Sequence, residues 1–347
     1  MKKMTIFAAA LLLAVCCKPV SGTDDPEPAP KTDPVFAKGA DLSWVTEMEG
    51  KGYKFYNDSG AVKECTALLK SIGFNTVRLR VWVNPDGGWC SAQDVLVKAR
   101  RARDLGMQIM IDFHYSDSWA DPGKQNVPAS WQGHGVQQMS GDVYDHTKEV
   151  LNLLKADGID VLWVQVGNEV TNGMLWENGR VKGSEVSGFA TLFNSGYSAV
   201  KQVYPDAAVV LHVDNAWNLG TLEWFYDLAV SGGCHFDMIG LSLYPSYWEN
   251  GSYPDWKPKC TQALSNFKTL HERYSLPVML VEFGMPAAQP SESAAALQYL
   301  LDGTSSFRDW FKGIILWEPE SEPARNGYAY GAFSGGKPTS ALAPFKN

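Results

Sequence analysis

The stretch "VLWVQVGNE" (161–169) begins as an apolar run and ends on Gly167, Asn168 and Glu169. A nearly continuous run of Val, Leu and Trp is typical of a strand that is buried on both faces, as in a parallel sheet. The carboxylate that follows it has two interpretations. It is an ordinary exposed loop acid, or it stands at the strand end because chemistry is done there.

The same pattern recurs along the chain, where apolar stretches alternate with helical stretches that end near Gly. Besides 161–169, strands are expected over 38–44, 74–83, 107–116, 207–215, 236–245, 277–284 and 313–320. Helices are expected between them, for example over 60–73, 92–106 and 144–158. This alternation predicts a single-domain α/β fold, the (β/α)8 TIM barrel. An open doubly wound sheet is the alternative, but no Gly-rich phosphate loop follows the first strand.

Side chains alternate between the two faces of a strand, which separates inward from outward residues. Arg78, Arg80 and Trp82 share one face of 74–83, opposite an aliphatic face that should meet the helices. Asp112 and His114 share a face of the next strand. Arg78 and Asp112 have two interpretations, an ion network inside the barrel or a role in the site. Arg80 lies nearer the mouth, and we expect it to act there.

Active residues of such a barrel lie at the C-terminal ends of its strands, where Glu169 and Glu282 end the fourth and seventh. Two carboxyl groups about 5–5.5 Å apart match retaining glycoside hydrolysis, in which one is protonated and the other ionised. By alternation, Glu282 shares a face with Val278 and Leu280. Trp317 is expected under the sugar, and Glu318, the next residue, is expected to point away from the mouth.

Composition narrows the ligand class. A net charge of −8 argues against nucleic acid, which needs a basic surface, and weakly against an acidic substrate. The 13 Trp and 14 Tyr fit a neutral polysaccharide, whose sugar rings stack on flat side chains. The H-x-H, H-E-x-x-H and G-x-S-x-G motifs are absent from the sequence. We therefore expect no metal and no other cofactor, since Glu292, Asp302 and Asp309 are too scattered for calcium.

The N-terminus reads as a targeting segment. Residues 1–17, "MKKMTIFAAALLLAVCC", resemble a lipoprotein-type signal that ends on Cys16 and Cys17, either of which could be acylated. Residues 18–35 form an acidic, Pro-rich linker, and 36–347 form the catalytic barrel. The protein is expected to be exported and lipid-anchored at the bacterial outer membrane or cell surface. The alternative is cleavage to a periplasmic or secreted form.

Four cysteines follow the signal segment: Cys65, Cys90, Cys234 and Cys260. Export permits the local disulfides Cys65–Cys90 and Cys234–Cys260, while a core of this size is stable without them. Free buried thiols are therefore the equal alternative.

Six stretches together resemble glycoside hydrolase family 53, the endo-β-1,4-galactanases of clan A: "GADLSWVTEMEGKG" (39–52), "TVRLRVWVNPDGG" (76–88), "DFHYSDSWADPGKQNVPASW" (112–131), "VQVGNEVTNGMLW" (164–176), "IGLSLYP" (239–245) and "LWEPE" (316–320). The resemblance implies a TIM barrel that cleaves β-1,4-galactan, found in type I arabinogalactan and in pectin, with retention. It implies that Glu169 is the acid/base and Glu282 the nucleophile. The strand-seven motif departs from the family pattern and reads "VEFGMP" (281–286), which puts the shape of the nearby subsite in doubt.

The resemblance also implies a set of substrate-binding residues. Around the cleaved bond these are Asn168, whose amide would bind the sugar 2-hydroxyl, and Arg80, His114, Tyr244 and Trp317. Along the groove they are Asp41, Trp82, Asp117, Trp119 and Trp176. For Trp119 and Trp176 the alternative is that they buttress loops.

Two other functions stay open on the sequence alone. One is a clan A endo-glycanase that acts on mannan or xylan, because the catalytic geometry is shared. The other is a surface glycan-binding protein on an inactive barrel. The expected partner is a neutral polysaccharide, bound by a monomer that meets a membrane only through its lipid anchor.

Overall fold

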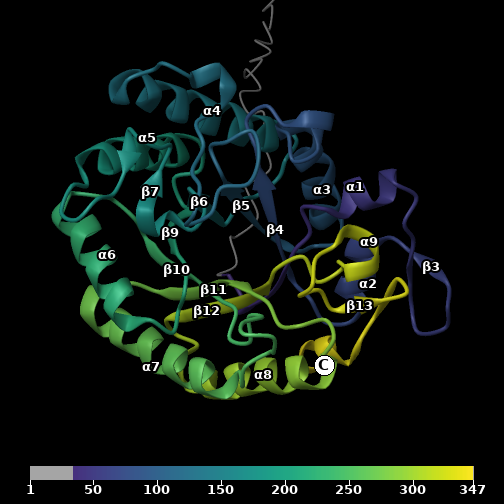
Figure 1. Ribbon diagram of the computed structural model, residues 1–347. Coiled ribbons are helices and arrows are strands. Elements are labelled where there is room, and N and C mark those ends of the chain that lie inside the picture. Colours follow the sequence, from purple (N-terminus) through teal and green to yellow (C-terminus); the bar gives the residue numbers. More distant parts are fainter. Residues whose placement is uncertain (1–33, 347) are drawn as a thin grey trace, which may run out of the picture. The chain divides into compact units, whose positions relative to one another are not determined.

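The computed structural model describes residues 34–346, and eight parallel strands of this range close into a barrel (Figure 1). Around the barrel the strands follow the order β1-β12-β11-β10-β9-β6-β5-β4. Their bounds are β1 Ala37–Asp41, β4 Thr76–Val81, β5 Gln108–Phe113, β6 Trp163–Val166, β9 Ala208–Val213, β10 Met238–Leu243, β11 Val278–Phe283 and β12 Phe311–Leu316. Each lies within, or overlaps, a stretch expected to be a strand, so the predicted (β/α)8 barrel is confirmed.

Helices surround the barrel on its outer side (Figure 1). They are α1 Val45–Gly50, α2 Cys65–Ser71, α3 Ala92–Asp104, α4 Val136–Ala156, α5 Ser187–Val203, α6 Leu219–Ser231, α7 Lys257–Tyr274, α8 Pro290–Gly303 and α9 Pro323–Asn326. The helix expected over 60–73 begins only at Cys65, because Glu64 caps it by accepting from two backbone N–H groups. The helix expected over 144–158 begins earlier, at Val136.

Three short antiparallel strand pairs lie outside the barrel sheet. They are β2 Phe55–Tyr56 with β3 Val62–Lys63, β7 Gly173–Met174 with β8 Gly179–Arg180, and β13 Phe333–Ser334 with β14 Lys337–Pro338. All three lie in connecting segments and leave the barrel order unchanged.

The barrel holds two separate apolar clusters. The larger lies between strands and helices and includes Val77, Leu79 and Val81 of β4. The smaller draws only on barrel strands and on residues next to them, so it fills the inside of the barrel; its members are Ala37, Met110, Trp163, Val210, Met238, Met279, Val281 and Ile315. Polar side chains on the same inward face lie nearer the C-terminal ends of the strands than this apolar cluster. The polar layer forms the floor of the barrel mouth.

Cys65, Cys90, Cys234 and Cys260 are buried free thiols, which settles the choice left open by the sequence. In the range 34–346 no helix is long and apolar enough to cross a membrane. The expected signal segment, its acylated cysteine and nearly all of the linker lie outside the described residues.

Candidate active site

The two glutamates singled out from the sequence face each other at the barrel mouth. Glu169 follows β6, and Glu282 is the penultimate residue of β11. One carboxylate oxygen of each lies within 4.8 Å of the other, and a ring nitrogen of His212 completes the group. This separation suits direct attack on a sugar carbon, because enzymes that place a water molecule between the carboxyl groups hold them about 6.5–9.5 Å apart.

Glu282 reaches the mouth because its strand is irregular. Val278 and Leu280 pack toward the helices, whereas Met279 and Val281 belong to the inner cluster. Strict alternation would turn Glu282 toward the helices, but β11 shifts register against both neighbouring strands before this residue. Such a bulge re-aims a side chain. The prediction that Glu282 shares a face with Val278 and Leu280 is therefore wrong, although its place at the mouth is confirmed.

Glu169 reaches the mouth through a sharp turn. Its backbone adopts the left-handed conformation, with φ 45° and ψ 56°. Gly167, two residues earlier, has φ 88°, and a Cβ there would lie 2.6 Å from Val170 Cγ1. A larger residue at 167 is thus excluded by both conformation and space. The turn places Glu169 at the edge of the mouth and leaves it only partly buried.

Arg78 organises the floor of the site. Its guanidinium lies 2.7 Å from Asp41, 2.9 Å from Asp112 and 3.4 Å from Glu282. It is fully buried. One cation thus faces three carboxylates below the mouth, which confirms the predicted ion network and brings positive charge to Glu282.

The two glutamates have different surroundings, which affect the pKa of each carboxyl group differently. Burial raises the pKa of both carboxyl groups, since it disfavours the charged form. For Glu282 this is opposed by Arg78 and by the hydroxyl of Tyr244, which donates a 2.7 Å hydrogen bond. The pKa of Glu169 is raised further by the charges of Glu282 and Asp214. Glu282 is therefore the group that ionises first, and Glu169 is the group that keeps its proton.

A hydrogen-bond chain leads to Glu169 from β9 and β10. The Nδ1 atom of His212 accepts from the backbone N–H of Glu169 at 3.2 Å and lies 2.8 Å from Gln165 Nε2. The proton of the neutral ring is therefore on Nε2, which donates to Ser242 Oγ at 2.7 Å. The Ser242 hydroxyl then donates to the carboxyl group of Glu169, which lowers the pKa of that group.

Glu169, His212 and Glu282 form the one group of three possible metal ligands in residues 34–346. Both ring nitrogens of His212 are already used in hydrogen bonds, so the imidazole offers no free lone pair to a cation. Burial and the nearby Arg78 also lower the pKa of His212 well below its usual range. The group fits a neutral histidine that supports Glu169 better than it fits a metal centre.

Arg80 occupies an aromatic enclosure at one side of the mouth. Its guanidinium carbon lies 4.1 Å from the ring centre of Trp119, 5.0 Å from that of Trp82 and 5.7 Å from that of Trp44. Its counter-ion is Glu318, at 2.9 Å. The prediction that Glu318 points away from the mouth is wrong, because its backbone has φ 44° and leaves the strand period.

Several predicted sugar-binding groups already have partners inside the protein. Asn168 accepts from Arg78 and donates to the backbone oxygen of Ala120, each at 2.9 Å, which leaves one amide N–H unassigned. His114 accepts from the Ala120 N–H at 3.1 Å through Nδ1, and its Nε2 lies 3.0 Å from Asp112. Their direct contacts with a sugar stay predictions.

The structure places the predicted groove residues unequally. Asp41 is fully buried and bonded to Arg78 and Ser43, which puts it in the floor and not in the groove. Asp117 accepts backbone N–H groups of Asn84 and Ala129, so it joins two loops. Trp176 donates to the Asn172 oxygen and packs under Arg180, at the edge of the site. Trp82, Trp119 and Trp317 form the aromatic wall that also encloses Arg80.

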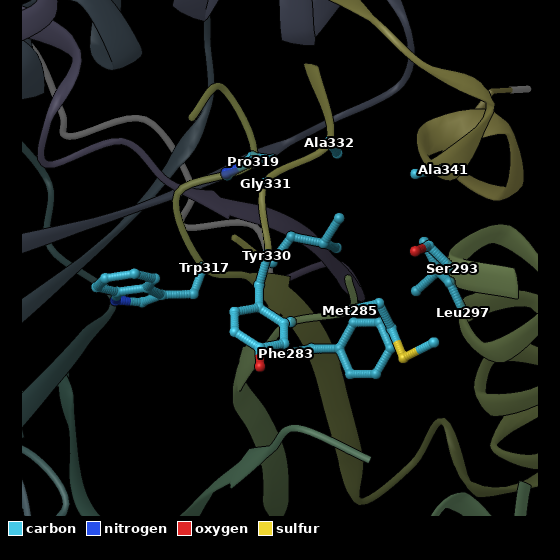
Figure 2. A pocket seen from close by; sticks show the side chains of 12 residues that line it. Phe283, Met285, Ser293, Leu297, Trp317, Pro319, Tyr330, Gly331, Ala332 and Ala341 are labelled. Carbon is cyan, nitrogen blue, oxygen red and sulfur yellow. The ribbon is translucent and has the colours of Figure 1, made fainter. Parts of the chain in front are cut away.

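A small, partly open cavity of about 20 Å³ lies behind this wall. Figure 2 shows Trp317, Tyr330 and Phe283 among the side chains that line it. Its volume suffices for about one water molecule and not for a sugar ring. This cavity is therefore not the place where a sugar ring binds.

His212 and Ser242 were not predicted from the sequence. His212 stands alone in an apolar strand and belongs to no recognisable motif, whereas Ser242 lies in the stretch "IGLSLYP" (239–245), which gave it no role. The alternation of side chains along a strand could have indicated that His212 faces into the barrel, since it lies two residues after the inward-facing Val210. The pairing of the two side chains depends on the neighbouring positions of β9 and β10 in the barrel.

A closed barrel that holds two facing carboxyl groups at the ends of its fourth and seventh strands defines a class: the protein is a glycoside hydrolase of the (β/α)8 type. Residues 37–305 match the family model described as Glycosyl hydrolase family 53. The chain belongs to this family.

The chain is also similar to individual proteins over most of their length. An "uncharacterized protein in bgaB 5'region" of Niallia circulans is 35% identical over 326 residues, covering 85% of this chain and 87% of that protein. A probable arabinogalactan endo-β-1,4-galactanase A of Neosartorya fischeri is 33% identical over 267 residues, covering 74% and 72%. A solved structure from a study of two fungal β-1,4-galactanases aligns with a TM-score of 0.79 at 29% identity, covering 89% of this chain and 98% of that chain.

Proposed function

We propose that the protein is an endo-β-1,4-galactanase that cleaves type I arabinogalactan and pectic galactan with retention of anomeric configuration. The observation that carries this proposal is the pair Glu169 and Glu282, whose oxygens approach within 4.8 Å while their surroundings differ. The named substrate of the fungal relatives supports galactan as the polymer. The net charge of −8 fits a neutral glycan.

In the first step the Glu282 carboxylate attacks the anomeric carbon and forms a covalent galactosyl ester. Glu169 gives its proton to the departing glycosidic oxygen, so the leaving chain departs as a neutral alcohol. The Ser242 hydroxyl donates to the carboxyl group of Glu169 and so stabilises the carboxylate that forms as the proton leaves.

In the second step Glu169, now ionised, removes a proton from water, and the hydroxide oxygen attacks the anomeric carbon to release Glu282. Formation of the ester has removed the charge of Glu282, which had raised the pKa of Glu169. The pKa of Glu169 therefore falls when a base is needed. Arg78 and the Tyr244 hydroxyl stabilise the leaving carboxylate.

The test is product release from linear β-1,4-galactan, with xylan and mannan in parallel, by the wild type, Glu169→Ala and Glu282→Ala. We expect galactan to be cut, with a loss of roughly 10²–10⁴-fold when the acid/base is removed. The first product, followed by proton NMR, should be the β-anomer. An α-anomer would exclude retention, and cleavage of xylan or mannan alone would refute galactan as the substrate. Galactan that is bound but not cut would identify a glycan-binding protein.

We also propose that the chain is exported and anchored by a lipid on Cys16 or Cys17. The basic start, the apolar stretch that ends in cysteine and the acidic linker of 18–35 support this. Metabolic labelling with a fatty acid tests it: label should be lost when both cysteines are replaced by Ser. Unlabelled protein released into the medium would favour a secreted form.

A further inference from the structure

An aromatic surface continues from the catalytic pair into the loop between β10 and α7. Tyr247 and Trp248 are neighbours in this loop and are 57% and 53% exposed. Large exposed apolar side chains are unremarkable when they are scattered, but a contiguous group beside a site marks a binding surface. We call this group the aromatic tract; its members are Tyr244, Tyr247, Trp248, Tyr253 and Tyr330.

Ring contacts connect the tract to Glu282 without a break. Tyr244 donates to the Glu282 carboxylate at 2.7 Å, and its ring centre lies 5.8 Å from that of Tyr330. Tyr330 stacks on Tyr247, with ring centres 5.1 Å apart and planes inclined by only 8°. Tyr330 and Trp317 also line the same cavity behind the mouth (Figure 2). The tract is therefore a continuation of the mouth and not a separate patch.

The outer end of the tract is held in a fixed shape. Glu249 and Ser252 exchange two 3.0 Å backbone hydrogen bonds across a turn. The central residues, Asn250 and Gly251, have φ 49° and 82°, as a two-residue hairpin turn requires. Trp248 and Tyr253 flank this turn and meet edge to face, with ring centres 4.7 Å apart. Rings ordered before binding lose little entropy when a ligand stacks on them.

A second contact joins the loop to Tyr330. The backbone N–H of Trp248 donates to the Tyr330 hydroxyl at 2.9 Å. The loop also closes on itself, because the Ser246 hydroxyl donates to the Pro254 oxygen at 2.6 Å. The exposed rings are thus fixed relative to Glu282.

The chemistry of the loop selects a neutral ligand. Residues 244–256 contain no Lys or Arg, while Glu249 and Asp255 carry negative charge. A uronate or phosphate would find no cation there and would be repelled. Flat rings with adjacent amide and hydroxyl groups, from Asn250 and Ser252, suit a neutral pyranose, which has an apolar face and a polar rim.

We propose that the aromatic tract binds a further galactosyl unit of the polymer, beyond the unit attacked by Glu282. This inference rests on the proposed galactanase function. The tract then determines how strongly the enzyme prefers long chains, because only a chain of sufficient length reaches from Glu282 to Trp248.

The test compares linear β-1,4-galacto-oligosaccharides of increasing length in the wild type and in the double variant Tyr247→Ala/Trp248→Ala. In the wild type KM is expected to fall once the chain reaches the tract. In the double variant this fall should shrink roughly three- to tenfold, the loss of about one stacked aromatic contact. Tyr247→Phe keeps the ring and should retain the wild-type length dependence. Trp224→Ala, an aromatic truncation on α6 at 39% exposure, is the matched control.

Equal length dependence in the wild type and the double variant would overturn the proposal while leaving galactanase activity intact. A double variant that only changes the sedimentation behaviour would assign the tract to a second copy of the chain, which also overturns it. If the wild type cuts no galactan, the proposed function fails separately. Retardation of the wild type in a galactan gel, lost in the double variant, would then still support the tract as a galactan-binding surface.

Discussion

Replacing Ser242 by Ala tests the hydrogen-bond chain that supports the acid/base. Ser242 is 1% exposed, so no water molecule replaces its hydroxyl without rearrangement. A hydrogen bond to a charged group contributes about 1.5–3 kcal/mol. If the whole of this stabilisation is lost from the transition state, kcat/KM falls roughly 10- to 150-fold. The His212 Nε2–H also loses its acceptor, which should reduce the free energy of unfolding by about 1–3 kcal/mol.

The pH dependence distinguishes this role from a purely structural one. The Ser242 hydroxyl stabilises the ionised form of Glu169 and so lowers the pKa of that carboxyl group. Without it the pKa rises, and the alkaline limb of the kcat/KM profile on linear galactan should move to higher pH. The matched control is Ser293→Ala, since Ser293 is also buried and bonds only to backbone oxygens of Pro286 and Gln289.

The reasoning is refuted if the alkaline limb of Ser242→Ala stays in place or moves to lower pH. It is also refuted if Ser293→Ala gives the same change, because a loss of general packing would then explain both variants. Urea unfolding of the two variants separates stability from catalysis.

Three further predictions concern charge. Arg78→Met leaves buried carboxylates without their counter-ion and should reduce the free energy of unfolding in urea by about 3–5 kcal/mol. The exposed Arg100→Met should change it far less, and equal losses would contradict the network. Burial and the charge of Glu318 raise the pKa of Glu320 well above its ordinary value of 4.5 in an unfolded chain, so this group should make stability fall as pH rises past 4.5. Glu320→Gln should flatten that fall, and an unchanged slope would count against it. Because His212 has no free nitrogen, dialysis against EDTA should leave activity intact, and activity restored by a divalent cation would disprove this.

Alternation and hydrophobic patterning predicted the barrel and the inward face of β4. They worked for Arg78 because β4 is a regular strand paired on both sides. They failed for Glu282 and Glu318, where a bulge and a left-handed residue interrupt the two-residue period. Both failures lie at the mouth, where the backbone leaves the sheet to present side chains.

The supporting partners of the site were the hardest part to predict. Ser242 and His212 meet because β9 and β10 are adjacent in the closed barrel, and a single sequence contains no record of that contact. The burial of Asp41 was missed for a related reason. An acidic residue at a strand end is a candidate for binding sugar hydroxyl groups. Only the position of Arg78 shows that the charge of Asp41 is already neutralised.

Trp317 packs against two of the tryptophans that enclose Arg80, and this gives the enzyme an intrinsic fluorescent reporter of binding. Trp44, Trp119 and Trp317 lie with ring centres 5.1–5.7 Å apart, so their excited states are close enough to exchange energy. A sugar laid on Trp317 displaces water from one member of this group and should alter the emission of the whole group. Titration of an inactive Glu282→Ala protein with galactan should therefore be visible by intrinsic fluorescence, without any label.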